Sequence, residues 1–364
     1  MIAASTALHR RVQSFIGEST EGQPAEGFDQ LACDLARFQA ARIPALARLA
    51  RARGLDVGAL SLARDVPAVP TDVFKLTRVA VHPAATDVRV FRTSGTTVGR
   101  RGEHPLRDLS TYELGAAAHG RRMLLPDGVR CRVLVLGPTP EAAADSSLAF
   151  MCGLFGRAFC DEGALFYGPG PATLRETLAR DLGATDLPVL LLGTSFAFVH
   201  LLDEPDGASL ELPPGSRVMQ TGGFKGRSRE VDAPALLVAI SDAFRVAPER
   251  VVSEYGMTEL SSQAYEGAIR ADLGYSPPLP RGVHVPPAWM RVTAVDSETL
   301  EELPEGTIGL ARVVDLANVD SAVAVQTQDR VRVVQGGFEL LGRAAGAPPR
   351  GCSLATEEML GVGP

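Results

Sequence analysis

The stretch 251-VVSEYGMTEL-260 is an apolar, β-branched run that breaks directly into a polar turn containing glycine. The same form recurs in 132-RVLVLG-137, 188-PVLLLG-193 and 217-RVMQTGG-223. Segments with helical character lie between these runs, at 141–157, 173–181 and 233–244. Repeated strand–turn–helix units predict an α/β fold of mostly parallel sheets flanked by helices. In such folds ligands gather at the carboxyl ends of the strands, where these polar turns lie.

The composition is that of an ordinary globular protein. The 364 residues are 45% hydrophobic and 22% charged, enough for two domains or for one large domain with an appendage. A formal net charge of −7 argues against a broad nucleic-acid-binding surface. No apolar run approaches the roughly 20 residues of a membrane span, and the amino-terminal stretch is too charged for a secretory signal.

The cysteines also point to an intracellular protein. The five are Cys33, Cys131, Cys152, Cys160 and Cys352. They form no CxxC pair and no Cys/His cluster with zinc-ligand spacing. An odd number of cysteines without a signal peptide is typical of free thiols in a reducing compartment. We therefore expect a cytoplasmic protein.

Three ranges of the chain differ in composition and in hydrophobic pattern. Residues 1–66 predict a helical region, because 28–54 is rich in Ala, Leu and Arg and ends at a glycine. Residues 67–342 predict the α/β core, which begins with the proline-broken segment 67-VPAVPTDVFKL-77 and includes a β-rich segment at 289–316. Residues 343–364 predict a short tail, rich in Gly, Pro and Ala, that cannot fold alone.

The segment 91-FRTSGTTVGRRGEH-104 could hold an anion. Its small residues offer backbone N–H groups, and Ser94, Thr96 and Thr97 offer hydroxyls. Gly95 and Gly99 allow close approach to a ligand, and such nests bind phosphate oxygens. It is not a Walker A loop, because the GK[ST] ending is missing. A plain polar surface turn explains the same composition equally well.

Three weaker signals follow along the chain. In 254-EYGMTEL-260 an exposed aromatic ring could stack on a base and Glu259 could bind Mg²⁺, although Thr258 could equally begin a helix. The glycine pair of 221-TGGFKG-226 could pack along a flat ring or form a simple turn. Asp329 could bind sugar hydroxyls or merely form a turn.

Taken in order, these segments resemble the adenylate-forming (ANL) enzymes, which include acyl-CoA ligases, non-ribosomal adenylation domains and luciferases. Residues 93–97 match the family's TSGTTG-type phosphate loop, where Val98 replaces the next glycine, and 255–259 match its YGxTE motif in full. The resemblance implies an N-terminal adenylation core with a truncated C-terminal domain. It implies Mg²⁺ binding by Glu259 and ATP binding by Ser94, Gly95, Thr96, Thr97, Gly222, Gly223, Tyr255, Gly256, Thr258, Asp329 and Arg343.

Two departures favour one branch of that family. Family members usually continue into a small domain that supplies a catalytic lysine, whereas this sequence stops soon after Arg343. Another cation must then stabilise the transition state, and Arg101 and Lys225 are the candidates we name, beside Arg100 and Arg343. The segment VPAVPTDVFK, the arginines after the phosphate loop and the ending 350-RGCSLATEE-358 together resemble the acyl-protein synthetases of bacterial bioluminescence operons (LuxE).

In that branch a cysteine near the carboxyl terminus accepts the acyl group, and Cys352 matches it. The neighbouring Arg350 would favour the thiolate, and Gly351 would leave a tether free to move. The expected reaction is ATP-dependent activation of a carboxylic acid, fatty or related, followed by transfer to Cys352 and then to a protein or small nucleophile. The alternatives are a ligase that passes the acyl-adenylate directly to CoA or an amine, and a non-catalytic nucleotide-binding protein.

Overall fold

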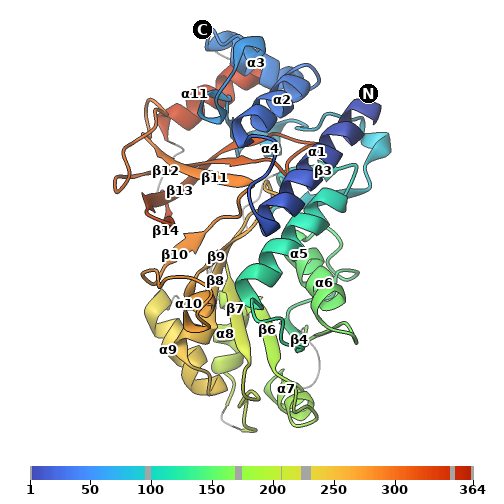
Figure 1. The fold of residues 1–364 in the computed structure, drawn as a ribbon, viewed down its shortest axis with the longest axis vertical. Coiled ribbons are helices and arrows are strands. Elements are labelled where there is room, and N and C mark those ends of the chain that lie inside the picture. The colour runs from blue at the N-terminus through green and yellow to red at the C-terminus, as the bar shows by residue number, and fades with distance from the viewer. Residues whose placement is uncertain are drawn as a thin grey trace. The chain divides into compact units, whose positions relative to one another are not determined.

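The fold was analysed in a computed structural model, which describes residues 2–94, 100–168, 174–205, 207–222, 231–344 and 349–361. Backbone contacts divide the chain into two units (Figure 1). Unit 1 comprises Met1–Ala118, Met257–Gln263 and Val285–Pro364. Unit 2 comprises His119–Gly256 and Ala264–His284. Helix α5, Ser110–Leu124, contains residues of both units, because the division falls between Ala118 and His119.

The strands of unit 2 form a mostly parallel sheet in the order β5–β4–β6–β7–β8–β9–β10. Their bounds are β4 Arg132–Leu136, β5 Ala164–Phe166, β6 Val189–Thr194, β7 Arg217–Thr221, β8 Val251–Tyr255, β9 Ala264–Glu266 and β10 Val283–Val285. Strands β5, β4, β6, β7 and β8 pair in parallel, and β9 runs antiparallel to β8. Strands β4 and β6 are buried almost throughout, which is why they appear in the sequence as unbroken apolar runs.

Helices pack against this sheet. They are α6 Ser147–Phe159, α7 Leu174–Leu182, α8 Ser195–Leu202, α9 Ala233–Phe244 and α10 Ala268–Asp272, with the 3₁₀ turn η4 Pro248–Arg250. Helix α6 contacts β4 and β5, α8 contacts β6 and β7, and α9 contacts β8. Leu191, Val218 and Phe198 belong to the apolar core that joins strands and helices. The α/β prediction for this part of the chain is confirmed.

Unit 1 contains a largely antiparallel sheet and a separate hairpin. The sheet strands are β11 Met290–Val295, β12 Ile308–Asp315, β13 Ala324–Val334 and β14 Gly337–Arg343, in that order, and the short β1 Val69–Pro70 pairs in parallel with β13. The hairpin is β2 Arg89–Arg92 with β3 Glu103–Leu106. This arrangement confirms the β-rich segment predicted from residue 289 onward.

The helices of unit 1 come from both ends of the sequence. They are α1 Ile2–Glu21, α2 Phe28–Ala40, α3 Pro44–Ala52, α4 Val73–Leu76 and α11 Arg350–Leu360, with 3₁₀ turns η1 Val57–Ala59, η2 Ala63–Asp65 and η3 Ala84–Thr86. Part of the predicted tail, 350–360, forms a helix in the folded chain. Helix α11 contacts α3 and β1, and Ala355 and Met359 are fully buried. The short helix therefore gains its stability from tertiary packing.

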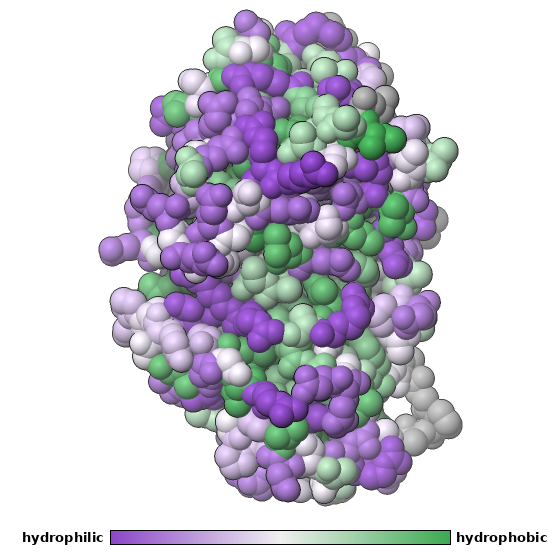
Figure 2. Space-filling view, turned by 45° about the vertical axis from the view of Figure 1, so that its right-hand side comes forward, coloured by the Kyte–Doolittle hydropathy of each residue, from purple (hydrophilic) through white to green (hydrophobic). Residues whose placement is uncertain are grey.

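Hydrophilic residues predominate on the face shown in Figure 2, and hydrophobic ones lie between them in small groups. Within the described residues, no helix combines the length and the apolar character needed to cross a membrane. The functional division into 1–66, 67–342 and 343–364 stays a prediction, because the two units are defined by their contacts alone.

Candidate functional site

The predicted phosphate loop is closed at its base in unit 1. It joins β2 to β3, whose last facing pair is Arg92 and Glu103. The Thr93 N–H donates to the Gly102 carbonyl at 3.0 Å, and the Gly102 N–H donates to the Thr93 hydroxyl at 2.9 Å. Ser94 is exposed. The predicted phosphate-binding residues Gly95, Thr96 and Thr97 lie outside the described part of the chain.

Arg101 holds the two ends of this loop together. Its Nε donates to the Thr93 carbonyl at 2.5 Å, and its Nη2 donates to the Arg92 carbonyl at 3.2 Å. These bonds place an exposed guanidinium at the loop base. Two of the guanidinium N–H groups are used in these bonds to the backbone. Arg101 therefore positions the ends of the loop, whether or not it also contacts a phosphate. Lys225, the other predicted cation, lies outside the described residues.

The YGMTE segment begins with the last residue of β8 and continues into a tight turn. Within unit 1, the Leu260 N–H donates to the Met257 carbonyl at 3.2 Å. No helix begins at Thr258, so the alternative in which Thr258 caps a helix is wrong. The Thr258 carbonyl instead accepts a 2.7 Å bond from Nδ1 of His104. Burial lowers the pKa of His104 to about 4, which keeps the ring neutral and its proton available for this carbonyl.

Glu259 is a buried residue of the predicted site in unit 1, and its electrostatics depart from those of an ordinary glutamate. Its side chain is buried, with 5% exposed, and this burial raises its pKa to about 7. The charges of Lys75 and Arg343 oppose the shift, whereas the Asp329 carboxylate adds to it. Glu259 is therefore a buried carboxylate whose charge the protein neutralises only in part.

Gly102 shows how closely the loop base approaches Glu259. A β-carbon on Gly102 would lie 3.6 Å from Oε1 of Glu259 and 3.6 Å from Cγ of Lys75. It would lie only 3.1 Å from the Cγ2 methyl of Thr93. The base of the phosphate loop, the Glu259 carboxylate and the Lys75 side chain thus converge within unit 1.

Asp329 and Arg343 lie opposite each other on β13 and β14 of unit 1. The strand register shifts between Asp329 and Val331. Asp329 is therefore a strand residue at an irregularity, and the alternative of an ordinary turn former is wrong. The Arg343 guanidinium donates to Oε1 of Gln328 at 3.3 Å. The structure brings both predicted nucleotide-binding residues into electrostatic range of Glu259.

The remaining predicted nucleotide-binding residues, Gly222, Gly223, Tyr255 and Gly256, belong to unit 2. Gly222 follows β7 with φ +73°, and a β-carbon there would meet no atom of the described residues within 4 Å. Its carbonyl accepts a 2.7 Å bond from Ser195 Oγ. Gly223 lies outside the described residues. Tyr255 is only 6% exposed, so the expectation of an exposed ring is wrong.

Cys352 lies in the first turn of α11 and is buried, with 2% exposed. It packs with Val295 and Leu310. Burial raises the pKa of its thiol to about 11; the Asp72 carboxylate adds to the shift and Arg53 opposes it. The expectation of an Arg350-stabilised thiolate is wrong for the resting protein, because a buried thiol resists ionisation. Gly351 is buried within the helix, whereas most of the Gly- and Pro-rich stretch before it, 345–348, lies outside the described residues.

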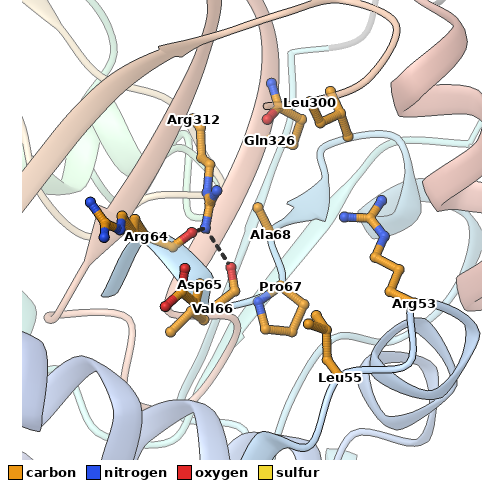
Figure 3. A pocket seen from close by; sticks show the side chains of 10 residues that line it. All are labelled: Arg53, Leu55, Arg64, Asp65, Val66, Pro67, Ala68, Leu300, Arg312 and Gln326. Atoms are coloured by element: carbon orange, nitrogen blue, oxygen red, sulfur yellow. Dashed lines mark hydrogen bonds between the residues drawn. The ribbon is translucent and has the colours of Figure 1, made fainter. Parts of the chain in front are cut away.

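Unit 1 contains a pocket of about 160 Å³ (Figure 3). Arg53, Arg64 and Arg312 line it, and Asp65 is the carboxylate among the lining residues. The Arg312 guanidinium points across the pocket and donates to the Val66 carbonyl at 2.7 Å. None of the predicted nucleotide-binding residues that the structure describes lines the pocket. It is connected to Cys352 through Leu300, which also packs on the Cys352 cluster.

Replacing Gly351 by alanine is expected to loosen α11. The added β-carbon would lie 2.8 Å from Cγ of Leu300 and 2.9 Å from the carbonyl oxygen of Glu298. This oxygen belongs to the backbone, so it cannot easily shift to relieve the clash. We expect a loss of about 1–2 kcal/mol in the free energy of unfolding, since overpacking outweighs the better helix propensity of alanine. Denaturant titration measures it, with Leu354→Ala as control at a 45% exposed position of the same helix. An unchanged or higher midpoint for Gly351→Ala would contradict this packing.

Solved structures match the fold. No protein-family model matches the sequence, and no curated protein does either. ATP-bound MatB from Rhodopseudomonas palustris matches with a TM-score of 0.51 and 18% identity, covering 72% of this chain and 49% of MatB. The chain has the adenylation-domain fold of the adenylate-forming ligases. It spans about half the length of MatB.

A second ligase matches over more of its length. An open conformation of 2-hydroxyisobutyryl-CoA ligase, in complex with 2-HIB-AMP and CoA, has a TM-score of 0.63 and 14% identity, covering 86% of this chain and 74% of that one. The same ligase in its thioesterification state gives 0.62 and 14%, covering 94% and 69%. Identities this low establish the fold and carry no substrate over to this chain.

Sequence reasoning missed two residues of the unit 1 site, Lys75 and Gly102, and it noted a third, His104, only as close enough to the loop to reach a ligand. Lys75 and Gly102 flank Glu259, and His104 fixes the turn that precedes it. Lys75 stands in the segment 67–77, which the resemblance singled out as a whole. A pattern search could have found the segment, but only the folded chain shows that its lysine faces the loop base.

Proposed function

We propose that this chain activates a carboxylic acid with ATP as an acyl-adenylate and then transfers the acyl group as a thioester. The convergence of the loop base, Glu259 and Lys75 within unit 1 carries this proposal. A loop of backbone donors suits phosphate oxygens, and neighbouring cations offset their charge. Asp329 and Arg343 lie within electrostatic range of the same carboxylate, as ribose- and phosphate-binding residues should.

Mg²⁺ fits this site as a companion of the nucleotide. Among residues that the structure describes, no three His, Cys, Asp or Glu side chains gather as a metal-binding group. Proteins commonly hold Mg²⁺ through one or two carboxylates together with substrate phosphates. Glu259, buried and incompletely neutralised, provides such a carboxylate. When bound, the ion would supply positive charge to the phosphates.

In the first half-reaction the substrate carboxylate attacks the α-phosphorus of ATP. A new O–P bond forms, the bond from the α-phosphorus to the bridging oxygen breaks, and pyrophosphate leaves. Positioning and charge stabilisation account for most of the catalysis in such substitutions. Arg101 keeps the loop ends together, and His104 keeps the Thr258–Glu259 turn in place.

In the second half-reaction the Cys352 sulfur attacks the acyl carbonyl. A C–S bond forms, the C–O bond to AMP breaks, and the thiol proton passes to solvent. The sulfur lies within electrostatic range of Asp72, which is paired with Lys75, so it belongs to the same region of unit 1. Because burial disfavours the thiolate, the transfer requires α11 to move away from Val295 and Leu310. Acylation of Cys352 makes the chain an acyl-protein synthetase.

The burial of Cys352 also favours a second candidate function. A thiol with 2% exposure and a raised pKa is a poor nucleophile in the resting protein. In this second function the acyl-adenylate passes directly to CoA or to an amine. 2-Hydroxyisobutyryl-CoA ligase, a structural relative, has been captured with both an acyl-AMP and CoA.

The test of the proposed function is acid-dependent ATP–pyrophosphate exchange. We expect at least one acid in a panel of fatty, aromatic and short polar carboxylic acids to support exchange. Nucleotide binding without exchange for any acid would contradict the proposal and indicate a non-catalytic nucleotide-binding protein. The active acid then serves in intact-mass analysis, where a mass shift on the protein reports acylation.

The acceptor is a protein or small nucleophile, and we propose a cytoplasmic setting because all five cysteines are free.

A further inference from the structure

Lysine is used very sparingly in this chain. Of its 36 lysines and arginines, only Lys75 and Lys225 are lysines. An ammonium is a compact point charge with three rotatable donors, whereas a guanidinium is a planar fork, so the two are not interchangeable. A chain that uses arginine for nearly every other cation has a lysine in the segment that reaches the phosphate-loop base. This choice suggests a need for an ammonium at that position.

The fold places Lys75 firmly. It lies in α4, which directly follows β1, and β1 pairs with β13, so that Pro70 faces Gln326. The Thr71 N–H donates to the Gln326 carbonyl at 3.0 Å. The ring of Phe74 packs edge-on against His104 at 6.1 Å between centroids. These contacts tie α4 both to the strand that carries Asp329 and to the strand that follows the loop.

The ammonium of Lys75 is oriented by a short polar relay. Its Nζ lies 2.6 Å from Oδ1 of Asp72, and Oδ2 of Asp72 accepts a 2.7 Å bond from Gln328. Gln328 in turn accepts a bond from Arg343. The Lys75 side chain is nevertheless 41% exposed. An ammonium has three donors, so it can keep Asp72 and still bind an oxyanion.

Lys75 also lies beside the residues proposed to bind the nucleotide. The position that a Gly102 β-carbon would occupy is 3.6 Å from Cγ of Lys75 and equally far from the Glu259 carboxylate. The Lys75 charge stabilises that carboxylate. A cation here faces the site at which the phosphates and Glu259 both bring negative charge.

We propose that Lys75 binds phosphate oxygens of ATP at the base of the 93–102 loop and that Asp72, held by Gln328, positions its ammonium. The inference rests on the proposed use of ATP by this chain. Lys75 is then a catalytic residue that contacts substrate, and Asp72 and Gln328 are positioning residues. Of the cations predicted from the sequence, Arg100, Arg101 and Arg343 carry a guanidinium rather than an ammonium, and Lys225 lies outside the described residues.

A lysine-reactive acyl phosphate of ATP tests this contact without any turnover. The probe acylates an amine close to the bound phosphates, and the chain offers only Lys75, Lys225 and the amino terminus as targets. Peptide mass mapping should find Lys75 acylated, and excess ATP should protect it. Labelling confined to Lys225 or the amino terminus, or Lys75 labelling that ATP does not reduce, would overturn the inference.

Exchange kinetics of variants provide the second test. We expect Lys75→Met to raise KM for ATP or lower kcat by about 10- to 100-fold, the worth of a hydrogen bond to a charged group. Lys75→Arg should recover part of the loss, and Asp72→Asn should give an intermediate defect with an unchanged thermal midpoint. The control is Arg130→Met, which removes one charge at a 79% exposed side chain.

The two tests separate the inference from the proposed function. If the wild-type protein shows no exchange with any acid, the proposed function fails, while ATP-protected labelling still reports the Lys75 contact. If the wild-type protein is active and Lys75→Met retains full exchange with unchanged KM for ATP, the Lys75 inference fails and the proposed function stands. That conclusion requires that the Lys75→Met protein is folded, which its thermal midpoint verifies.

Discussion

Replacement of Glu259 by glutamine should lower the rate of acid-dependent pyrophosphate exchange by on the order of 100- to 1,000-fold. Glutamine preserves the size of the side chain but removes the negative charge that a hard cation requires. Exchange measured at saturating ATP and acid reports the effect. The control Glu305→Gln, at an exposed position of the same unit, should retain full activity. Full activity of Glu259→Gln would contradict its proposed role.

The same substitution should stabilise the protein at high pH. Burial raises the pKa of Glu259 to about 7, above the 4.5 of an ordinary glutamate. The folded protein therefore keeps a proton that the unfolded chain loses between these values. The contribution to the free energy of unfolding is fully present below pH 4.5 and falls by ~3 kcal/mol as pH rises through 7. Glutamine has no such dependence.

Denaturant titration at several pH values measures this difference. The stability of Glu259→Gln relative to wild type should rise between pH 5 and pH 8. Other buried acids whose pKa values are raised, Glu254 and Asp315, contribute equally to both proteins and cancel. A pH-independent difference between the two proteins would show that Glu259 is not the perturbed carboxylate described here.

Replacement of Cys352 by alanine should abolish covalent acylation and leave adenylation intact. With the active acid and ATP, intact-mass analysis should show one acyl adduct on the wild-type protein and none on Cys352→Ala. Pyrophosphate exchange should persist, because the first half-reaction does not use the thiol. Since Cys352 is buried with Val295 and Leu310, some loss of stability is also expected.

A second buried thiol provides the matched control. Cys33 is 1% exposed, and burial raises its pKa as well. Cys33→Ala should lose stability to a similar extent but keep the acyl adduct. If Cys352→Ala keeps both pyrophosphate exchange and formation of the final product at wild-type rates, transfer through Cys352 is excluded, and direct hand-over to CoA or an amine becomes the better function.

Much of the fold could be predicted because its signals are local. Runs such as 188-PVLLLG-193 become strands buried on both faces, and an uninterrupted apolar run bounded by turns is the pattern such strands require. The alternating segment from residue 289 onward becomes an antiparallel sheet, and its pattern is also local, because successive side chains of a strand point to opposite faces. Helix α11 was not predicted, because an isolated helix of 11 residues is marginal by local propensity and this one is stabilised by packing on α3.

Burial was the property that sequence reasoning most often got wrong. Tyr255 was expected to be exposed, and Cys352 was expected to lie on a mobile tail beside an arginine. Both are buried, and the arginine that opposes the Cys352 pKa shift is Arg53, far away in the sequence, rather than Arg350. Sequence neighbours say little about which side chains share a low-dielectric interior, because burial depends on elements brought together by the fold.

By itself, the sequence determined the α/β class, the positions of the motif turns and the identity of Glu259 as a candidate ligand, since each depends on residues adjacent in the chain. Only the tertiary structure decided that Lys75 and Gly102 stand beside that carboxylate, that His104 fixes its turn, and that Cys352 is held in a helix. These outcomes depend on strand pairing between distant segments, β1 with β13 and β2 with β3. The motifs therefore supply the candidate ligand Glu259, whereas the packing of distant segments sets the electrostatic environment of its carboxylate.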